Sequence, residues 1–165
     1  MRPLRGLALL LLIASCATRG AVPSSSAARE EIARVLDDWH DAAAKADEAR
    51  YFSHFAKEGV FLGTDATERW DVEQFRVWAH PHFARGKAWA FKSVRRAIAL
   101  SPDGRTAWFD EDLATENLGP CRGSGVLRLE EGRWKIAQYN LALTVPNEKF
   151  DAVKKALGAP AQESP

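Results

Sequence analysis

The chain contains little cysteine and no excess of one charge. Its 165 residues include two cysteines, Cys16 and Cys121, and carry a formal net charge of +1. Because Cys16 falls in an N-terminal signal described below, we expect Cys121 to lack a disulfide partner, which excludes a disulfide-stabilised scaffold. The balanced charge also lacks the basic footprint of a nucleic-acid binder, so we expect no nucleic-acid partner.

Histidines with the spacing of a metal site are also lacking. His80 and His82 flank Pro81, and no third ligand follows at a suitable interval. Cys121 has no histidine at the spacing of a nucleophilic pair. We therefore expect no metal, no cofactor and an inert thiol.

No apolar run is long enough to cross a bilayer, which takes about 20 residues. The run Leu7–Ala14 comes after Arg2 and Arg5 and is followed directly by Ser15 and Cys16. A positive start, a short apolar run and small residues at a cleavage site are typical of a secretory signal. The chain is therefore expected to be exported.

The end of this signal resembles a bacterial lipobox. Ile13–Cys16 places small residues before a cysteine, and in a lipobox that cysteine is acylated and becomes the first mature residue. We therefore predict a lipoprotein signal peptide at residues 1–15 and a membrane anchor through lipid on Cys16. Ordinary export with a coincidental cysteine is the alternative. Ala17 follows the cysteine in place of an inner-membrane retention aspartate, which by the same resemblance favours the periplasmic face of the outer membrane.

Composition divides the remaining chain into three parts. Residues 16–28 contain glycine, proline and serines without apolar periodicity, which predicts a flexible tether. Residues 29–158 are long enough for one domain with its own core. Residues 159–165 are predicted to be disordered.

Helical patterns come first in the folded domain. Apolar residues recur at three- and four-residue steps over residues 29–46, which predicts an amphipathic helix. Asp47 can cap a shorter second helix, and a short strand is expected at residues 60–62. A third helix is expected to begin at Asp71 and to break or kink at Pro81, which has no N–H.

Strand patterns follow the helices. Four long strands are expected at residues 89–100, 105–115, 122–130 and 133–144, before a last helix capped by Asn147. Their short turns predict an antiparallel sheet. Helices followed by such strands predict an α+β fold in which a cone-shaped, curved antiparallel sheet wraps around the N-terminal helices. The hollow of such a cone suits a buried ligand.

Four short segments carry a family resemblance. Residues 44–56 match a helix–helix joint, Gly63–Trp70 reads GTDATERW, and residues 123–127 and 132–139 match two final strands. These segments resemble the SnoaL-like branch of the nuclear transport factor 2 and ketosteroid isomerase superfamily, over nearly all of residues 29–146. The resemblance implies the cone-shaped fold and a homodimer through the outer sheet face. It implies no single activity, because the fold hosts isomerases, dehydratases, cyclases and binding modules.

The catalytic residues of ketosteroid isomerases do not carry over. Aligning the helix joint puts Trp39 where these enzymes have the tyrosine of the oxyanion hole, and Gly63 at the position of the base. Aligning the third long strand puts Val126 in place of the acid. Asp65, two residues beyond Gly63, could take the role of the base.

Two parts of the chain contain candidates for acid–base chemistry. Asp65 and Glu68 lie beside Trp70, where either a general base at the mouth of a pocket or a cap for the next turn is expected. His54 lies between two phenylalanines in sequence and is the second candidate for a pocket acid or base.

The second long strand must send at least one acid inward. Strand alternation places Asp110 and Asp112 on one face and Glu111 on the other. If Glu111 faces inward, it either lines the pocket or pairs with an arginine of a neighbouring strand, since carboxylates are rarely buried alone. The partners available are Arg95, Arg96 and Arg122.

Adjacent residues on the other strands also point to opposite faces. Of Arg95 and Arg96, one could therefore bind an anionic ligand in the cone. Of Tyr139 and Asn140, one can reach the interior and orient a ligand carbonyl.

These patterns give one set of expected site residues and three functions. The catalytic candidates are Asp65 and His54. The first function is binding of a small molecule, which needs a void above about 300 Å³. The second is an isomerase, dehydratase or cyclase with a pocket base, and the third is a homodimeric interaction module. The expected ligand-binding residues are Asp65, Trp70, Trp78, Trp89, Arg95, Trp108, Glu111 and Tyr139.

Overall fold

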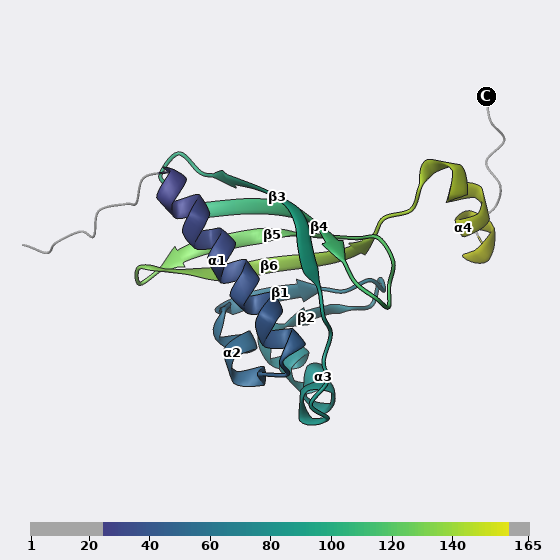
Figure 1. Cartoon of the computed structure of the whole chain (residues 1–165), viewed down its shortest axis with the longest axis horizontal. Coiled ribbons are helices and arrows are strands. Elements are labelled where there is room, and N and C mark those ends of the chain that lie inside the picture. Colours follow the sequence, from purple (N-terminus) through teal and green to yellow (C-terminus); the bar gives the residue numbers. More distant parts are fainter. Residues whose placement is uncertain (1–24, 159–165) are drawn as a thin grey trace, which may run out of the picture.

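The computed structural model describes residues 25–158, in which helices pack against one face of a curved, unclosed sheet (Figure 1). The expected signal peptide, Cys16 and the tail at 159–165 lie outside the described residues. Helix α1 covers Ser25–Ala44 and buries Ile32, Leu36 and Trp39, which confirms the predicted amphipathic helix. It begins earlier than predicted, so the end of the expected tether is helical.

The second helix and the first strands follow a tight joint. Helix α2, Glu48–Ser53, begins at Asp47, whose carboxylate accepts a hydrogen bond from the Arg50 N–H. Strand β1, Phe55–Leu62, starts earlier than predicted. It pairs with β2, Arg69–Asp71, a short antiparallel strand that the sequence did not predict.

Helix α3, Val72–Ala84, begins as predicted at Asp71, which forms a capping box with Gln74. The predicted break at Pro81 is wrong, because the helix continues to Ala84. Pro81 lies in the last turn and is exposed, so the hydrogen bond that it cannot donate is lost at the surface, where water can replace it.

The four long strands form the predicted meander. They are β3, Lys92–Leu100; β4, Thr106–Ala114; β5, Cys121–Glu130; and β6, Arg133–Leu143, each antiparallel to the next. The sheet order is β2-β1-β6-β5-β4-β3.

Strand β1 pairs in parallel with β6, a pairing that lies outside the four long strands predicted to be antiparallel. The prediction rested on hairpin links, which fix the direction only of strands joined by a short turn. Strands β1 and β6 are separated by α3 and four other strands, and no turn constrains their relative direction.

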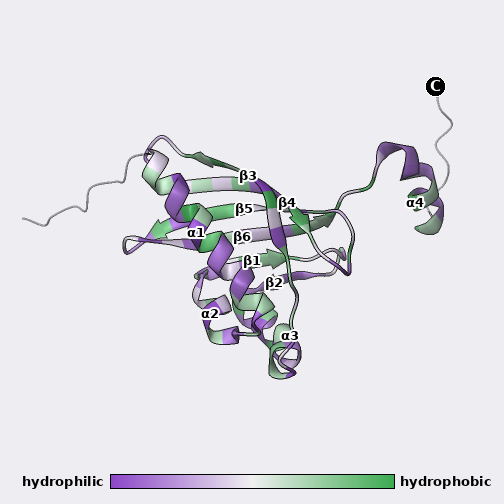
Figure 2. Ribbon diagram, in the orientation of Figure 1, coloured by the Kyte–Doolittle hydropathy of each residue, from purple (hydrophilic) through white to green (hydrophobic). Residues whose placement is uncertain are grey.

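Alternation along β4 settles which face of the sheet is covered. Phe109, Glu111 and Leu113 are buried on the concave side, whereas Trp108 is 51% exposed on the convex side. Figure 2 shows many polar residues of α1 on the side of the helix that faces away from the sheet. The concave side and α1 to α3 therefore enclose the core.

Two segments depart from the predicted strand and helix bounds. Residues 86–91 are not in a strand, although the pattern predicted one from Trp89, and they lead from α3 into β3. The predicted last helix forms as a short 3-10 turn, Asn147–Lys149, and α4, Phe150–Ala156, apart from the sheet (Figure 1). Asn147 starts the 3-10 turn and does not cap α4. Among residues 25–158, no helix has the length and apolar character needed to cross a membrane.

Candidate functional site

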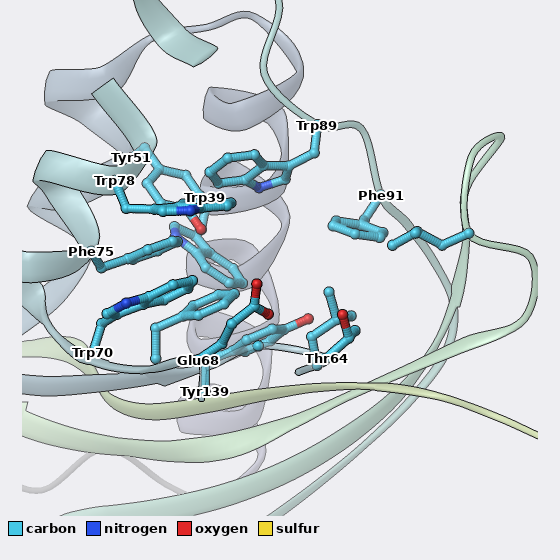
Figure 3. Close-up of a pocket in the computed structure, with 14 residues that line it drawn as sticks. Trp39, Tyr51, Thr64, Glu68, Trp70, Phe75, Trp78, Trp89, Phe91 and Tyr139 are labelled. Atoms are coloured by element: carbon cyan, nitrogen blue, oxygen red, sulfur yellow. The ribbon is translucent and has the colours of Figure 1, made fainter. Parts of the chain in front are cut away.

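An aromatic pocket of about 170 Å³ lies between the helices and the concave face of the sheet (Figure 3). Side chains from α1, α2, α3, the β1–β2 hairpin, residues 86–91, the β4–β5 loop and β6 meet there. We call it the aromatic pocket, and its lining residues are Trp39, Tyr51, Phe61, Gly63, Thr64, Glu68, Trp70, Phe75, Trp78, Trp89, Phe91, Leu118, Tyr139 and Leu141.

Stacked rings form one wall of the aromatic pocket. Phe75 of α3 is nearly parallel to Phe61 and Trp70, with ring centroids 4.0 and 5.7 Å away and interplanar angles of 18° and 7°. Trp70 stacks in turn on Trp78 at 4.8 Å. Offset stacking of this kind adds to the burial of each ring. The wall is therefore held in place by its own packing, and Figure 3 shows it on the side opposite Phe91.

Three buried hydrogen-bond donors of the aromatic pocket have no partner. They are the hydroxyls of Tyr51 and Tyr139 and the indole Nε1 of Trp39, on side chains no more than 2% exposed. A buried polar group left unsatisfied costs about 1–3 kcal/mol. Such groups are rare in native proteins and call for a functional explanation.

Both tyrosines keep their protons. Burial, followed by the neighbouring Tyr139, raises the pKa of Tyr51 well above its ordinary value; the Trp89 indole, which can donate to the Tyr51 oxygen, opposes this with a smaller effect and leaves the Tyr51 O–H without an acceptor. Burial, followed by the charge of Glu111, does the same to the pKa of Tyr139. The two hydroxyls therefore keep their protons, and so remain able to donate, at every physiological pH.

Glu68 carries the one charge among the lining residues of the aromatic pocket. A Cβ on Gly63 would lie 2.1 Å from the Glu68 Oε2 atom and 2.8 Å from its Cβ, so the Glu68 side chain occupies the space above Gly63. The backbone N–H of Asp65 donates to the same Oε2 atom at 3.1 Å. Because Gly63 has no side chain, the Glu68 carboxylate can occupy this space.

A buried polar cluster lies behind the aromatic pocket and joins α1 to the sheet. Glu111 of β4 is fully buried; its Oε1 atom lies 2.7 Å from His40 Nε2, and its Oε2 atom accepts a hydrogen bond from Arg96 Nε at 2.8 Å. Arg96 also donates to the Ala33 carbonyl at 3.1 Å and pairs with Asp37 at 2.9 Å. Glu111 thus pairs with an arginine on a neighbouring strand, one of the alternatives left open by the sequence.

The ionised form of Glu111 is the stable one. Burial would raise its pKa, but the hydrogen bond and charge of His40, together with Arg96, lower the pKa below the ordinary value. The rings of Trp39, Phe91 and Tyr139 surround His40 with centroids 4.9, 6.2 and 6.4 Å away. The cluster is therefore separated from the aromatic pocket by a single layer of side chains.

Gly123 leaves room for two of these groups to approach. A Cβ at this position of β5 would lie 2.3 Å from the Tyr139 hydroxyl and 3.0 Å from the Glu111 Oε1 atom. Real Cβ atoms do not approach so closely, so a side chain at residue 123 would displace one group or both. The sequence motif contained Gly123, but nothing in it indicated this role.

Four of the expected ligand-binding residues line the aromatic pocket: Trp70, Trp78, Trp89 and Tyr139. Glu111 also faces inward, but it lies behind Tyr139, and its two oxygens contact His40 and Arg96. The structure therefore brings together the aromatic half of the expected set.

Arg95 and Trp108 do not reach the aromatic pocket, contrary to expectation. Arg95 donates to Asp112 at 2.8 Å on the convex face, where Trp108 is also exposed. The bulge between Ser93 and Arg95 and the pairing of Arg96 with Glu111 turn Arg96 inward instead. The sequence showed that the two arginines point to opposite faces, but not which one points inward.

Asp65 and His54, the expected catalytic residues, also lie outside the aromatic pocket. The Asp65 carboxylate accepts from the Thr67 hydroxyl and N–H at 2.5 and 2.8 Å, hydrogen bonds that lower its pKa. It therefore stabilises a turn, the alternative that the sequence allowed. His54 lies 2.8 Å from Asp38, although burial keeps its pKa below the ordinary value.

Several lining residues were not expected from the sequence. Tyr51 and Phe75 belong to the apolar faces of short helices, and Leu118 belongs to the loop between β4 and β5. Trp39 had one useful indication, because the family alignment placed it where ketosteroid isomerases have a donor. Within residues 25–158, no cluster of three or more histidine, cysteine or acidic side chains could hold a metal ion.

The aromatic pocket is smaller than the sequence-based hypothesis required. Its volume of about 170 Å³ is below the lower bound of about 300 Å³ for typical ligand sites. A cavity of about 150 Å³ nevertheless holds a benzene molecule. A polar cleft of about 570 Å³ adjoins it, because Trp89 and Phe91 line both. The aromatic pocket therefore fits a single ring, and larger groups would extend into the cleft.

The fold and this pocket define a class of protein, an α+β domain whose helices and curved sheet enclose a small aromatic pocket. The family model described as a SnoaL-like domain matches residues 32–146. The chain therefore belongs to the SnoaL-like family, with the nuclear transport factor 2-like fold that the sequence predicted.

Solved structures agree with this fold at low sequence identity. A proposed aromatic ring hydroxylase from Novosphingobium aromaticivorans superposes with a TM-score of 0.65 at 18% identity, over 75% of this chain and 94% of the other. A proposed ketosteroid isomerase from Parabacteroides distasonis gives 0.56 at 16%, over 70% and 86%. A proposed scytalone dehydratase from Novosphingobium aromaticivorans gives 0.60 at 11%, over 73% and 86%. No match was found among curated proteins.

Replacing Gly123 by alanine should destabilise the domain by about 1–3 kcal/mol, the usual cost of overpacking a core. The added methyl group would meet the Tyr139 hydroxyl and the Glu111 carboxylate. Urea unfolding measures the difference. Ser124→Ala, at the next position of the same strand and facing the convex side, is the control and should change stability little. Equal stability of G123A and the wild-type protein would contradict the close approach described here.

Proposed function

We propose that this protein binds a small, largely apolar ring compound that carries an acceptor oxygen. The observation that carries the proposal is the set of three buried, unpartnered donors in the aromatic pocket, Tyr51, Tyr139 and Trp39. A ligand oxygen placed among them would restore the hydrogen bonds whose absence destabilises the empty pocket. The stacked rings would contact the apolar part of the same ligand.

The setting proposed for this activity follows from the N-terminal sequence. A charged start, a short apolar run and the lipobox-like Ile13–Cys16 support export and a lipid anchor on Cys16. Ala17 supports the periplasmic face of the outer membrane. A pocket of this size would then meet ring compounds that have entered the cell envelope.

Replacing Tyr51 or Tyr139 by phenylalanine should separate binding from stability. Neutral single-ring probes (phenol, benzamide and 2-cyclohexen-1-one) should bind the wild-type protein with a Kd of about 1 mM or tighter. Each substitution should weaken binding about 3- to 10-fold, the effect of one lost hydrogen bond, because the ligand oxygen loses a donor. The unfolding free energy of the empty protein should stay equal or rise, because an unsatisfied buried hydroxyl is removed.

Calorimetric titration and urea unfolding measure these two quantities. Trp108→Phe, which changes an aromatic side chain on the convex face, is the control and should bind as the wild type does. If none of the three probes binds at millimolar concentration, or if both tyrosine variants bind unchanged, the proposal is wrong.

A second candidate function is enzymatic, with Glu68 as a general base. It is favoured by the position of the Glu68 carboxylate, which lies in the aromatic pocket above Gly63, the position that alignment gives to the base of ketosteroid isomerases. A carboxylate in a pocket that also holds hydrogen-bond donors could remove a proton from carbon next to a carbonyl while a donor stabilises the resulting oxyanion. The likeness to a proposed ketosteroid isomerase and a proposed scytalone dehydratase supports this candidate.

Proton exchange tests this candidate directly. The wild-type protein should speed exchange of the protons next to the carbonyl of 2-cyclohexen-1-one for deuterium in heavy water, followed by NMR. Glu68→Gln should reduce that rate by about 100-fold or more, the usual contribution of a general base. Asp65→Asn, which changes the neighbouring carboxylate outside the pocket, should leave the rate unchanged. Equal rates for E68Q and the wild type would exclude Glu68 as the base.

A homodimer through the convex face of the sheet is proposed alongside either activity. Trp108 is 51% exposed there, and Ala99 and Val126 are its partners on the neighbouring strands. An exposed tryptophan among small apolar residues is typical of a protein interface. Sedimentation should show a dimer for the wild type and a monomer for Trp108→Glu, with probe binding retained. A wild-type monomer at all concentrations would contradict the proposal.

A further inference from the structure

The charge of the ligand is a separate question from its shape, and it concerns the groups around the Tyr139 hydroxyl. Among the lining residues of the aromatic pocket, Glu68 is the one charged side chain and there is no lysine, arginine or histidine. The local charge of the pocket is therefore negative, although its unpartnered buried polar atoms are the donors of Trp39, Tyr51 and Tyr139.

A second carboxylate lies behind the donor group. The Glu111 Oε1 atom and the Tyr139 hydroxyl both lie within 3.0 Å of the point that a Gly123 Cβ would occupy. The carboxylate is fully buried, so little water screens it from an atom bound at Tyr139. Its charge is also felt by the hydroxyl, since it contributes to the raised pKa of Tyr139.

Two groups contact the Glu111 carboxylate, one at each oxygen. His40 of α1 lies against the Oε1 atom and Arg96 of β3 binds the Oε2 atom, and Arg96 is shared with Asp37 and the Ala33 carbonyl. The positive charge of Arg96 is thus divided between two carboxylates. His40 contacts the same Oε1 atom that approaches Tyr139, and Arg96 also acts on the Tyr139 hydroxyl, but the effect of Glu111 on the pKa of Tyr139 is larger than that of Arg96.

We propose that Glu111 is a specificity-determining residue that makes the aromatic pocket select a neutral acceptor oxygen and reject a carboxylate, phenolate or phosphate in the same place. The selection rests on the ligand-binding function proposed above and adds the charge state of the ligand to it. An anion bound at Tyr139 would gain hydrogen bonds from the donors, but would lie close to Glu111 and Glu68. A carbonyl, ether or neutral hydroxyl gains the same hydrogen bonds without that repulsion.

Benzamide and benzoate form a matched pair for the test, because they have nearly the same shape and differ by one negative charge at neutral pH. Calorimetric titration of the wild-type protein should show benzoate binding at least about tenfold more weakly than benzamide, a ratio expected for one like charge within several ångströms in a partly buried site. Glu111→Gln keeps the shape of the side chain and removes its charge. The affinity for benzoate should therefore rise toward that for benzamide, and the ratio of the two dissociation constants should fall.

Variants of Glu68, which lines the aromatic pocket, and of the more distant Glu116 complete the set. Glu68→Gln should reduce the ratio only in part, and Glu116→Gln, in the adjoining polar cleft, should leave it unchanged. Circular dichroism checks that E111Q is folded. If it is not, a ratio that falls only in part in E68Q and stays unchanged in E116Q supports selection by Glu111, while a ratio that disappears in E68Q overturns the assignment.

The outcomes separate this inference from the proposed function. If benzamide binds, Tyr139→Phe weakens it and benzoate binds equally well or more tightly, charge selection by Glu111 is wrong and the binding function stands. If the ratio is large in the wild type and unchanged in a folded E111Q, Glu111 is not its source. If no neutral probe binds at all, the proposed function fails and the inference fails with it.

Discussion

The buried charge of Glu111 links the helical layer to the sheet. Its two oxygens contact His40 of α1 and Arg96 of β3, and Arg96 extends the link to the backbone of α1. Removing one partner of a buried ion pair costs about 3–5 kcal/mol, so alternative placements of α1 that break these contacts are strongly disfavoured. With α1 held there, Trp39 and Tyr139 lie against each other, with ring centroids 4.5 Å apart, at one wall of the aromatic pocket.

The aromatic pocket combines a rigid wall with unsatisfied donors, and these two properties favour the same kind of ligand. Rings that stack on one another lose little entropy when a ligand arrives, because they are already ordered. The donors, in contrast, gain hydrogen bonds that the empty pocket does not provide. A small compound with one apolar ring and one acceptor oxygen meets both conditions, and the polar cleft beside Trp89 and Phe91 leaves room for a substituent.

Much of the fold could be predicted, and the exceptions share a cause. The amphipathic period of α1, the Asp71 cap of α3 and the four-strand meander depend on neighbours in sequence, and all three were predicted correctly. The parallel pairing of β1 with β6 depends on residues far apart in the chain. The aromatic residues of the pocket were partly predictable because large rings are buried in most settings. The polar residues were not, because a surface turn and a pocket use the same carboxylates.

The amino-acid sequence determined the family, the order of the helices and strands, and the fact that Glu111 faces away from Asp110 and Asp112. Period and turn chemistry are local properties, and a strand places alternate residues on opposite faces wherever it lies. Only the tertiary structure decided which face is concave, so that Arg96 points inward and Arg95 outward. It also decided that Glu68 enters the pocket while Asp65 closes a turn, because that choice depends on the empty space above Gly63.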